Sequence, residues 1–204
     1  MKNIAVLASG RGTNLQAIIE NIESGAIKAN LACVISDNPD APALERAREH
    51  TIKAIYLDPG PKKTWLVPKV EEKYVQTLKD HNIDLICLAG FMRIIKKPLL
   101  DAFAEKIINI HPSLLPSFPG LDVQQKAIDH GVKFSGCTVH FVDDSVDGGP
   151  IIVQAAVPVL DDDDADTLAA RILKEEHRIY TEAINLVLSD KYRIVGRRVI
   201  KTGG

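Results

Sequence analysis

The chain has 204 residues, of which 25% are charged and 46% hydrophobic, a balance typical of a soluble globular protein with one well-buried core. Its formal net charge of -2 provides no broad positive surface for phosphate backbones, so we expect no nucleic-acid partner. No run of about 18 consecutive apolar residues occurs, which argues against a membrane span. We therefore expect a single-domain cytoplasmic protein with one functional site.

The first two-thirds of the chain alternate short apolar runs with longer amphipathic stretches, as parallel strands joined by crossover helices do. Strands are predicted at Lys2–Ser9, Leu31–Ser36, Lys53–Leu57, Leu85–Leu88 and Ile107–Ile110. Helices are predicted at Asn14–Ser24, Pro42–His50, Trp65–His81 and Pro98–Phe103.

After Gly131 the pattern changes. Two strands, Phe134–Val142 and Ile151–Pro158, flank an acidic turn that contains glycine, and a final helix is predicted over Thr167–Leu188 with Asp166 as its N-cap. The fold class that follows is α/β: three α/β/α layers around a mostly parallel, Rossmann-like central sheet, with an antiparallel addition after residue 131. Such sheets bind ligands beyond the carboxyl ends of their strands.

The three cysteines and the six histidines give no sign of a metal. Cys33, Cys87 and Cys137 each lie inside an apolar run without CxxC spacing, which favours buried free thiols and a reducing compartment. The histidines form neither an HxH nor an HExxH arrangement. We expect no metal cofactor.

The loop after the first strand is the first candidate binding site. It reads SGRGTNL from Ser9 and opens the first helix, so its backbone N–H groups converge at the positive end of the helix dipole. Gly10 and Gly12 supply half of a dinucleotide fingerprint, but Leu15 replaces the third glycine and obstructs a pyrophosphate. A monophosphate fits better, while a plain tight turn with Thr13 as N-cap stays open as the alternative.

A second candidate site begins where the fifth strand ends. Strand alternation puts Asn109 and His111 on the same side of the chain, and prolines from Pro112 onward stiffen the loop that follows. Asp147 lies in the later strand-to-strand turn. Taken singly, the histidine favours a structural role and the aspartate an ordinary turn. Together the three supply an oxyanion donor, a proton-shuttling imidazole and an orienting carboxylate, which suffice for acyl transfer between two nitrogens.

Five stretches occur in an order and spacing shared with one enzyme family. They are SGRGTN, LAGFMRI (Leu88–Ile94), NIHPSLLPSFPG (Asn109–Gly120), GCTVHFVDDSVDGGPII (Gly136–Ile152) and EEHRIYTEAI (Glu175–Ile184). In these stretches, which span nearly the whole chain, the protein resembles the glycinamide ribonucleotide formyltransferases, folate-dependent enzymes of purine synthesis. The resemblance implies one formyltransferase domain, with residues 1–100 as the phosphate-binding half and 101–204 as the catalytic and folate-binding half.

The resemblance also assigns residues to roles. Asn109, His111 and Asp147 match the catalytic set. Apart from the resemblance, Pro112 and His140 are predicted in support, and for His140 core packing stays open as an equal alternative. The positions implied for the substrate are Gly12, Thr13, Asn14 and Leu15 at the phosphate and Glu176 at the ribose. Those implied for the folate are Phe91, Met92, Arg93, Ile94, Val142, Asp143, Asp144 and Val146. The chain departs from the family at Asp122, where a histidine is usual.

The implied reaction moves a formyl group from 10-formyltetrahydrofolate, as co-substrate, to the amine of 5'-phosphoribosylglycinamide. Formyltetrahydrofolate hydrolase, which resembles the chain in the same trio, is one alternative, although that family carries an extra N-terminal regulatory domain. Methionyl-tRNA formyltransferase is disfavoured because it needs a C-terminal nucleic-acid domain. A non-enzymatic nucleotide-binding module using only the first loop is a further alternative. Monomer and homodimer both stay open.

Overall fold

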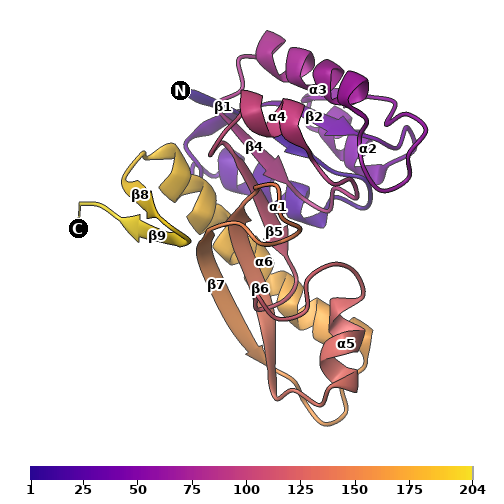
Figure 1. Ribbon diagram of the computed structural model, residues 1–204, viewed down its shortest axis with the longest axis vertical. Helices are drawn as coiled ribbons and strands as arrows, with labels where there is room; N and C mark the ends of the chain where they lie inside the picture. Colours follow the sequence, from indigo (N-terminus) through magenta and orange to yellow (C-terminus); the bar gives the residue numbers. More distant parts are fainter. Residues whose placement is uncertain (204) are drawn as a thin grey trace. The chain divides into compact units, whose positions relative to one another are not determined.

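The computed structural model describes residues 1–203 and has two compact units, Met1–Asn109 and a second that begins at Ile110 (Figure 1). The α/β class predicted from the sequence is confirmed, with parallel strands in the first unit and antiparallel pairing after residue 131. The single domain predicted above stays a prediction.

Parallel strands in the order β3-β2-β1-β4-β5 form the sheet of the first unit. These strands are β1 (Lys2–Leu7), β2 (Ala29–Ser36), β3 (Lys53–Tyr56), β4 (Leu85–Leu88) and β5 (Ile107–His111), the last of which runs on into the second unit. All four residues of β4 are buried, as expected for a parallel strand that is covered on both faces.

Four helices connect these strands: α1 (Thr13–Glu23), α2 (Pro42–Glu49), α3 (Pro68–Asp80) and α4 (Lys97–Ala102). Right-handed crossovers place α1 and α2 together on one face of the sheet and α3 and α4 on the other. The predicted helix over Trp65–His81 begins later, at Pro68, because Val67 is held extended by the proline that follows it.

In the second unit, β6 (Phe134–Phe141) pairs antiparallel with β7 (Ile151–Pro158). Two short strands, β8 (Tyr192–Val195) and β9 (Arg198–Lys201), extend this sheet, and β9 pairs with β7. The long helix α6 (Ala165–Leu188) packs on β6 and β7 through a face that buries Leu168 and Ile172, while α5 (Val123–Asp129) contacts α6.

The start of α6 differs from the prediction. Its N-cap is Asp164, not Asp166: the Asp164 carboxylate accepts a hydrogen bond from the Thr167 N–H at 2.8 Å, and the Asp164 N–H donates to the Thr167 hydroxyl at 2.9 Å. This reciprocal capping box fixes the helix start. Asp166 lies in the first turn of the helix, where its charge is still favoured by the helix dipole.

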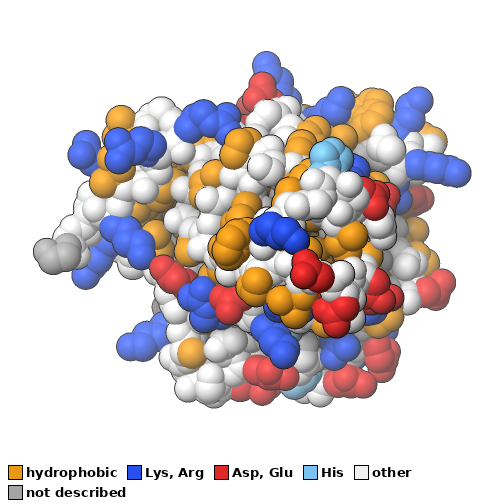
Figure 2. Space-filling model, turned by 90° about the horizontal axis from the view of Figure 1, so that it is seen from below, with side chains coloured by type: hydrophobic (Ala, Val, Ile, Leu, Met, Phe, Trp, Pro, Cys, Tyr) orange, Lys and Arg blue, Asp and Glu red, His pale blue; other side chains and the backbone are white. Residues whose placement is uncertain are grey.

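Three expectations from composition can be set beside the structure. Cys33, Cys87 and Cys137 are buried free thiols, as predicted. Over residues 1–203 no helix is long and apolar enough to cross a membrane. On the face drawn in Figure 2, basic and acidic side chains are interspersed.

Candidate active site

The first loop turns into α1 through Gly12, which is the N-cap at φ 70° and ψ 35° with no side-chain capping hydrogen bond. Thr13 is therefore the first residue of the helix, and the alternative in which Thr13 caps it is wrong. A Cβ at Gly12 would lie 3.0 Å from the Ala43 Cβ, so both the left-handed backbone and the close approach of α2 require glycine. The helix N-terminus keeps its backbone orientation for an anion.

Helix α2 holds this loop in place. The Ala43 N–H donates to the Gly10 carbonyl at 3.2 Å, and Arg46 Nε donates to the Arg11 carbonyl at 2.9 Å. Leu15, predicted at the phosphate, has a fully buried side chain, so only its backbone could take part. The phosphate role of Gly12, Thr13, Asn14 and Leu15 stays a prediction.

Asp37 directly follows β2, at the place where dinucleotide-binding sheets carry the acid that binds a ribose. Here its carboxylate, only 4% exposed, receives a hydrogen bond from Arg93 Nε at 2.5 Å. The acid is thus committed to an ion pair within the first unit, which fits the sequence argument against a dinucleotide site.

Residues 91–94, predicted to line the folate, follow β4 and alternate between buried and exposed. Phe91 is buried against Tyr74, with ring centroids 6.1 Å apart, whereas Met92 and Ile94 are 57% and 42% exposed. The Arg93 guanidinium is engaged with protein groups, so Arg93 has its backbone to offer a ligand. Two exposed apolar side chains suit a flat aromatic ring, and the assignment stays a prediction.

His111 and Asp147, predicted from separate stretches of the sequence, come together in the second unit. His111 Nδ1 lies 3.5 Å from Asp147 Oδ2, and both side chains are largely buried. His111 Nε2 lies 3.0 Å from the Phe118 carbonyl oxygen. Both ring nitrogens of His111 thus face acceptor oxygens.

Asn109 precedes His111 by two residues in β5. Alternation along the strand directs the two side chains to the same side of it. Of the predicted trio, the structure brings His111 and Asp147 within ion-pair reach, and the part of Asn109 stays a prediction.

A hydrogen-bonded loop, residues 112–120, fixes the acceptor of His111. The buried Ser113 hydroxyl is 3.0 Å from the same Phe118 carbonyl and 2.7 Å from the Ser117 carbonyl. Thr138 of β6 donates its hydroxyl to the Ser113 carbonyl at 2.7 Å and accepts from the Leu115 N–H at 3.0 Å. The loop is thereby tied to the sheet of the second unit.

Sequence analysis missed Ser113 and Thr138 as supports of the site. A further missed support is Gln154 of β7, whose Nε2 donates to the Leu115 carbonyl and to Thr138 Oγ1, each at 2.9 Å. The sequence feature that could have predicted this role is the position of Thr138 within an apolar strand, because a buried polar side chain needs a hydrogen-bond partner.

The turn that carries Asp147 is closely packed. Asp147 has φ 51°, and its Oδ2 accepts a hydrogen bond from the Gly120 N–H at 2.9 Å. A Cβ at Gly149 would lie 1.9 Å from the Phe141 carbonyl oxygen, so glycine is required where the turn returns to β7. These contacts hold the carboxylate beside His111.

Residues 142–146, predicted to close around the folate, form the outer part of the same turn. The Asp143 carboxylate accepts the Ser145 N–H at 2.9 Å and is used within the turn. Asp144 and Val146 are exposed, and Val142 is half-buried. Their contact with a folate stays a prediction.

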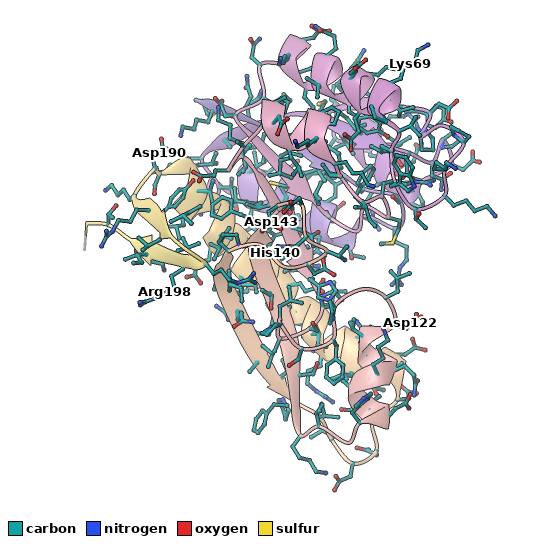
Figure 3. All side chains as sticks on the ribbon, viewed as in Figure 1. Lys69, Asp122, His140, Asp143, Asp190 and Arg198 are labelled. Atoms are coloured by element: carbon teal, nitrogen blue, oxygen red, sulfur yellow. The ribbon has the colours of Figure 1, made fainter. Side chains whose placement is uncertain are left out.

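His140, predicted in support, lies on the other side of Asp147 near the end of β6, where Figure 3 labels it with Asp143. Its Nδ1 is 2.8 Å from the Phe141 carbonyl oxygen, and its Nε2 is 3.8 Å from Asp147 Oδ1. Burial lowers the pKa of His140, with the Phe141 carbonyl and Asp147 opposing this effect. A neutral His140 leaves the Asp147 charge available to His111.

The comparisons with known proteins agree on one family. The family model described as formyl transferase matches residues 2–184. The chain belongs to the formyl transferase family. The predicted resemblance is thereby confirmed.

The relatives and solved structures of this family include full-length matches. Phosphoribosylglycinamide formyltransferase of Haemophilus influenzae is 43% identical over 195 residues, 95% of this chain and 91% of that protein. The Drosophila melanogaster trifunctional purine biosynthetic protein adenosine-3 is 45% identical over 92% of this chain, but the match spans only 14% of its length. Glycinamide ribonucleotide transformylase 1 from Symbiobacterium toebii has a TM-score of 0.95 and 50% identity, and the match covers 100% of this chain and 95% of that chain.

A formyltetrahydrofolate deformylase from Pseudomonas syringae pv. tomato has the same fold, with a TM-score of 0.91. Its sequence identity is 26%, and the match covers 99% of this chain and 66% of that chain. Because the fold is shared, an assay is needed to distinguish formyl transfer from hydrolysis.

Glu176 matches the family pattern, whereas Asp122 departs from it. Glu176, matched to the ribose-binding acid, lies on the buried face of α6 and, after burial itself, is the next cause that raises the pKa of Cys137 to about 12. The ribose contact stays a prediction. Asp122, which departs from the family histidine, is the exposed N-cap of α5 at φ 56°.

The predicted absence of a metal cofactor stays a prediction. Within residues 1–203 no group of three or more His, Cys, Asp or Glu side chains is arranged to hold a metal ion. Pro112, predicted in support, is half-buried between His111 and Ser113.

Proposed function

We propose that the protein transfers a formyl group from 10-formyltetrahydrofolate to the amine of 5'-phosphoribosylglycinamide. The products are 5'-phosphoribosyl-N-formylglycinamide and tetrahydrofolate. The observation that carries the proposal is the His111–Asp147 pair, 3.5 Å apart at the end of β5, in a chain of the formyl transferase family. Its full-length relative in Haemophilus influenzae bears the name of this activity.

In this reaction the amine nitrogen forms a bond to the formyl carbon, and the bond from that carbon to N10 of the folate breaks. A proton leaves the amine and reaches N10. Negative charge develops on the formyl oxygen in between, and groups that already point at that oxygen lower the barrier because they need no reorganisation. Asn109 and His111 are the donors that we assign to this oxygen.

His111 would serve as a donor through Nε2, which now faces the Phe118 carbonyl at 3.0 Å. A formyl oxygen would replace this carbonyl as the acceptor, so one hydrogen bond is exchanged for another. Asp147 stays beside Nδ1 of His111 and balances the charge of a protonated ring. It also assists the transfer of the proton from the substrate amine to N10 of the folate. The Gly120 N–H keeps the carboxylate in this orientation.

The substrates would be held by groups of different kinds. The turn at Gly12 and the start of α1 would bind the phosphate, and Glu176 the ribose hydroxyls. The exposed side chains of Met92, Ile94 and Val146 would contact the pteridine ring. Apolar and backbone contacts to the ring, with few charged ones, are typical of such pockets.

A single assay separates this function from its alternatives. The protein is incubated with 10-formyltetrahydrofolate, with and without phosphoribosylglycinamide, and the folate absorbance is followed. We expect turnover that depends on the amine. Turnover without the amine would instead identify a hydrolase, and no turnover in either mixture would leave a binding module.

The role of Asn109 is tested by Asn109→Ala. Removal of one oxyanion donor lowers turnover by about 10²–10³-fold, and we expect that loss in kcat with both KM values nearly unchanged. The far-ultraviolet circular dichroism and melting temperature serve as controls for the fold. A variant with near-native kcat would contradict the assignment.

A further inference from the structure

One guanidinium in the first unit joins three segments that are distant in sequence. Arg93 Nε donates to Asp37 Oδ2 at 2.5 Å, at the end of β2. Arg93 Nη1 donates to the carbonyl oxygens of Lys62, at 2.9 Å, and Lys63, which precede α3. The planar fork of an arginine suits this kind of simultaneous contact.

The residues on either side of Arg93, Met92 and Ile94, also form hydrogen bonds to neighbouring segments through their backbone N–H groups. The Met92 N–H donates to the Ser9 hydroxyl at 2.9 Å, and the Ile94 N–H donates to the Thr64 carbonyl at 2.9 Å. Ile94 and Trp65 form a parallel bridge. Residues 91–94 and 62–65 thus form one layer, whose exposed side chains include Met92 and Ile94.

The charge that holds this layer is buried. The Asp37 side chain is only 4% exposed and that of Arg93 is 17% exposed. Among residues 1–203, Asp37 Oδ1 has no hydrogen-bond partner. The Asp37 carboxylate therefore relies on the ion pair between its Oδ2 and Arg93. A buried ion pair that loses one partner leaves the other charge uncompensated, so its surroundings rearrange.

We propose that Asp37 is a positioning residue for the folate co-substrate. Through Arg93, it holds residues 62–65 and 91–94 in the arrangement that receives the pteridine, and it contacts neither substrate. The inference rests on the proposed function, since it assigns a ligand to this layer. The inference gives a role to Asp37, which takes part neither in the proposed phosphate loop nor in the region around His111.

The primary test is Asp37→Asn, which keeps the size of the side chain and an acceptor for Arg93 but removes the charge. Small displacements of a binding layer reduce affinity strongly, so we expect the KM for 10-formyltetrahydrofolate to rise by about tenfold or more. The KM for phosphoribosylglycinamide and kcat at saturating folate should stay within about twofold, because the groups assigned to those steps are elsewhere. Arg93→Lys, which keeps the charge but not the fork, should act in the same direction.

Trp65, the only tryptophan of the chain, gives a readout that needs no turnover. It lies in the same layer, with Lys96 Nζ 4.4 Å from its ring centroid. Its fluorescence can be titrated with tetrahydrofolate alone. We expect weaker binding by Asp37→Asn and unchanged binding by Asp40→Asn, the matched control, since Asp40 is exposed in the same connection.

The outcomes separate the inference from the proposed function. A selective loss of folate affinity in Asp37→Asn, absent in Asp40→Asn, supports the inference. An unchanged folate KM, or equal losses in both KM values and kcat, overturns it while the wild type is active. If the wild type shows no turnover, the proposed function fails, and the tetrahydrofolate titration still decides whether Asp37 controls binding.

Discussion

The loop at Gly12 and the region around His111 represent two different ways of building a site. At Gly12 the proposed binding groups belong to the backbone, and their direction follows from a left-handed turn and the start of α1. Around His111 they are side chains, and their direction follows from a loop that hydrogen bonds tie to β6 and β7. The first site depends on the backbone conformation, and the second depends on the chemical identity of its side chains.

The difference teaches which kind of substitution damages each site. A backbone site tolerates changes of side-chain chemistry but not an added Cβ where the backbone needs glycine. A side-chain site is damaged by replacements that keep the shape and change one atom.

Asp147→Asn is expected to cause the largest loss. The amide oxygen can still accept the Gly120 N–H, so the turn should keep its shape, but the charge beside His111 Nδ1 disappears. Groups that move protons typically contribute about 10²–10⁴-fold to a rate, and we expect a decrease in kcat within that range. Steady-state kinetics measure it, with Asp129→Asn on exposed α5 as the control. Equal kcat values for the two variants would contradict the assigned role.

Gly12→Ala tests the backbone site. The added methyl group meets Ala43 at 3.0 Å and forces a left-handed residue other than glycine, so we expect a loss of about 1 kcal/mol in the free energy of unfolding. The displaced turn should also raise the KM for phosphoribosylglycinamide, by about tenfold, with the folate KM unchanged.

Gly25→Ala is the matched control for Gly12→Ala. Gly25 also has a positive φ, 78°, but a Cβ there would contact nothing within 4 Å. Both variants should lose stability, and only Gly12→Ala should lose affinity for the phosphorylated substrate. Equal KM values in the two variants would exclude a phosphate at this loop.

The same contrast explains what the sequence could predict. The parallel sheet and its helices were predictable because apolar runs and amphipathic stretches repeat with the right periods, and β4 and β7 match their predicted bounds. His111 and Asp147 were predictable only as a set, because each taken singly favours a structural role, whereas together with Asn109 they supply the groups that acyl transfer needs. In contrast, α5 and the strands β8 and β9 were missed. The four residues of β4 form an uninterrupted buried apolar run, whereas charged residues interrupt β8 and β9, none of whose residues is buried, and α5 buries only Val123 and Ala127.

Supports of the site were harder to predict than its reacting groups. Ser113 and Gln154 act through carbonyl oxygens of a loop whose path depends on tertiary contacts. The ion pair between Asp37 and Arg93 joins residues 56 positions apart, and nothing in local spacing brings them together. Long-range hydrogen bonds of this kind follow from the fold rather than from a motif.

Ser113→Ala should have a moderate effect. The hydroxyl lies at hydrogen-bonding distance from the Phe118 and Ser117 carbonyls, and its loss should lower the free energy of unfolding by about 1 kcal/mol. The loop next to His111 would then be held less firmly, and kcat should decrease several-fold. Urea unfolding and kinetics measure both effects. Ser117→Ala in the same loop is the control because Ser117 is exposed, and a larger effect there would argue against this role for Ser113.

The smallest expected effect concerns Glu71, a buried acid in the first unit that belongs to neither site. Its Oε1 accepts the Lys96 N–H at 2.5 Å and thereby joins α3 to the start of α4. Burial raises the pKa of Glu71 above its ordinary value of 4.5, although the backbone N–H groups of Lys96 and Leu99 oppose the rise. The protonated form is thus favoured by folding. Its stabilising contribution is complete below pH 4.5 and is lost as the pH rises through the pKa of the folded state.

Glu71→Gln keeps a neutral acceptor for Lys96 at every pH. Relative to the wild type, the variant should therefore gain stability as the pH rises from 4.5 through the pKa of Glu71 in the folded state. Urea unfolding at several pH values measures the difference, and Glu72→Gln on the exposed side of α3 should show no such trend. A difference that is constant with pH would mean that the acid is ionised at no extra cost. Unlike Asp147, whose charge we expect the reaction to need, Glu71 would then serve only as a hydrogen-bond acceptor.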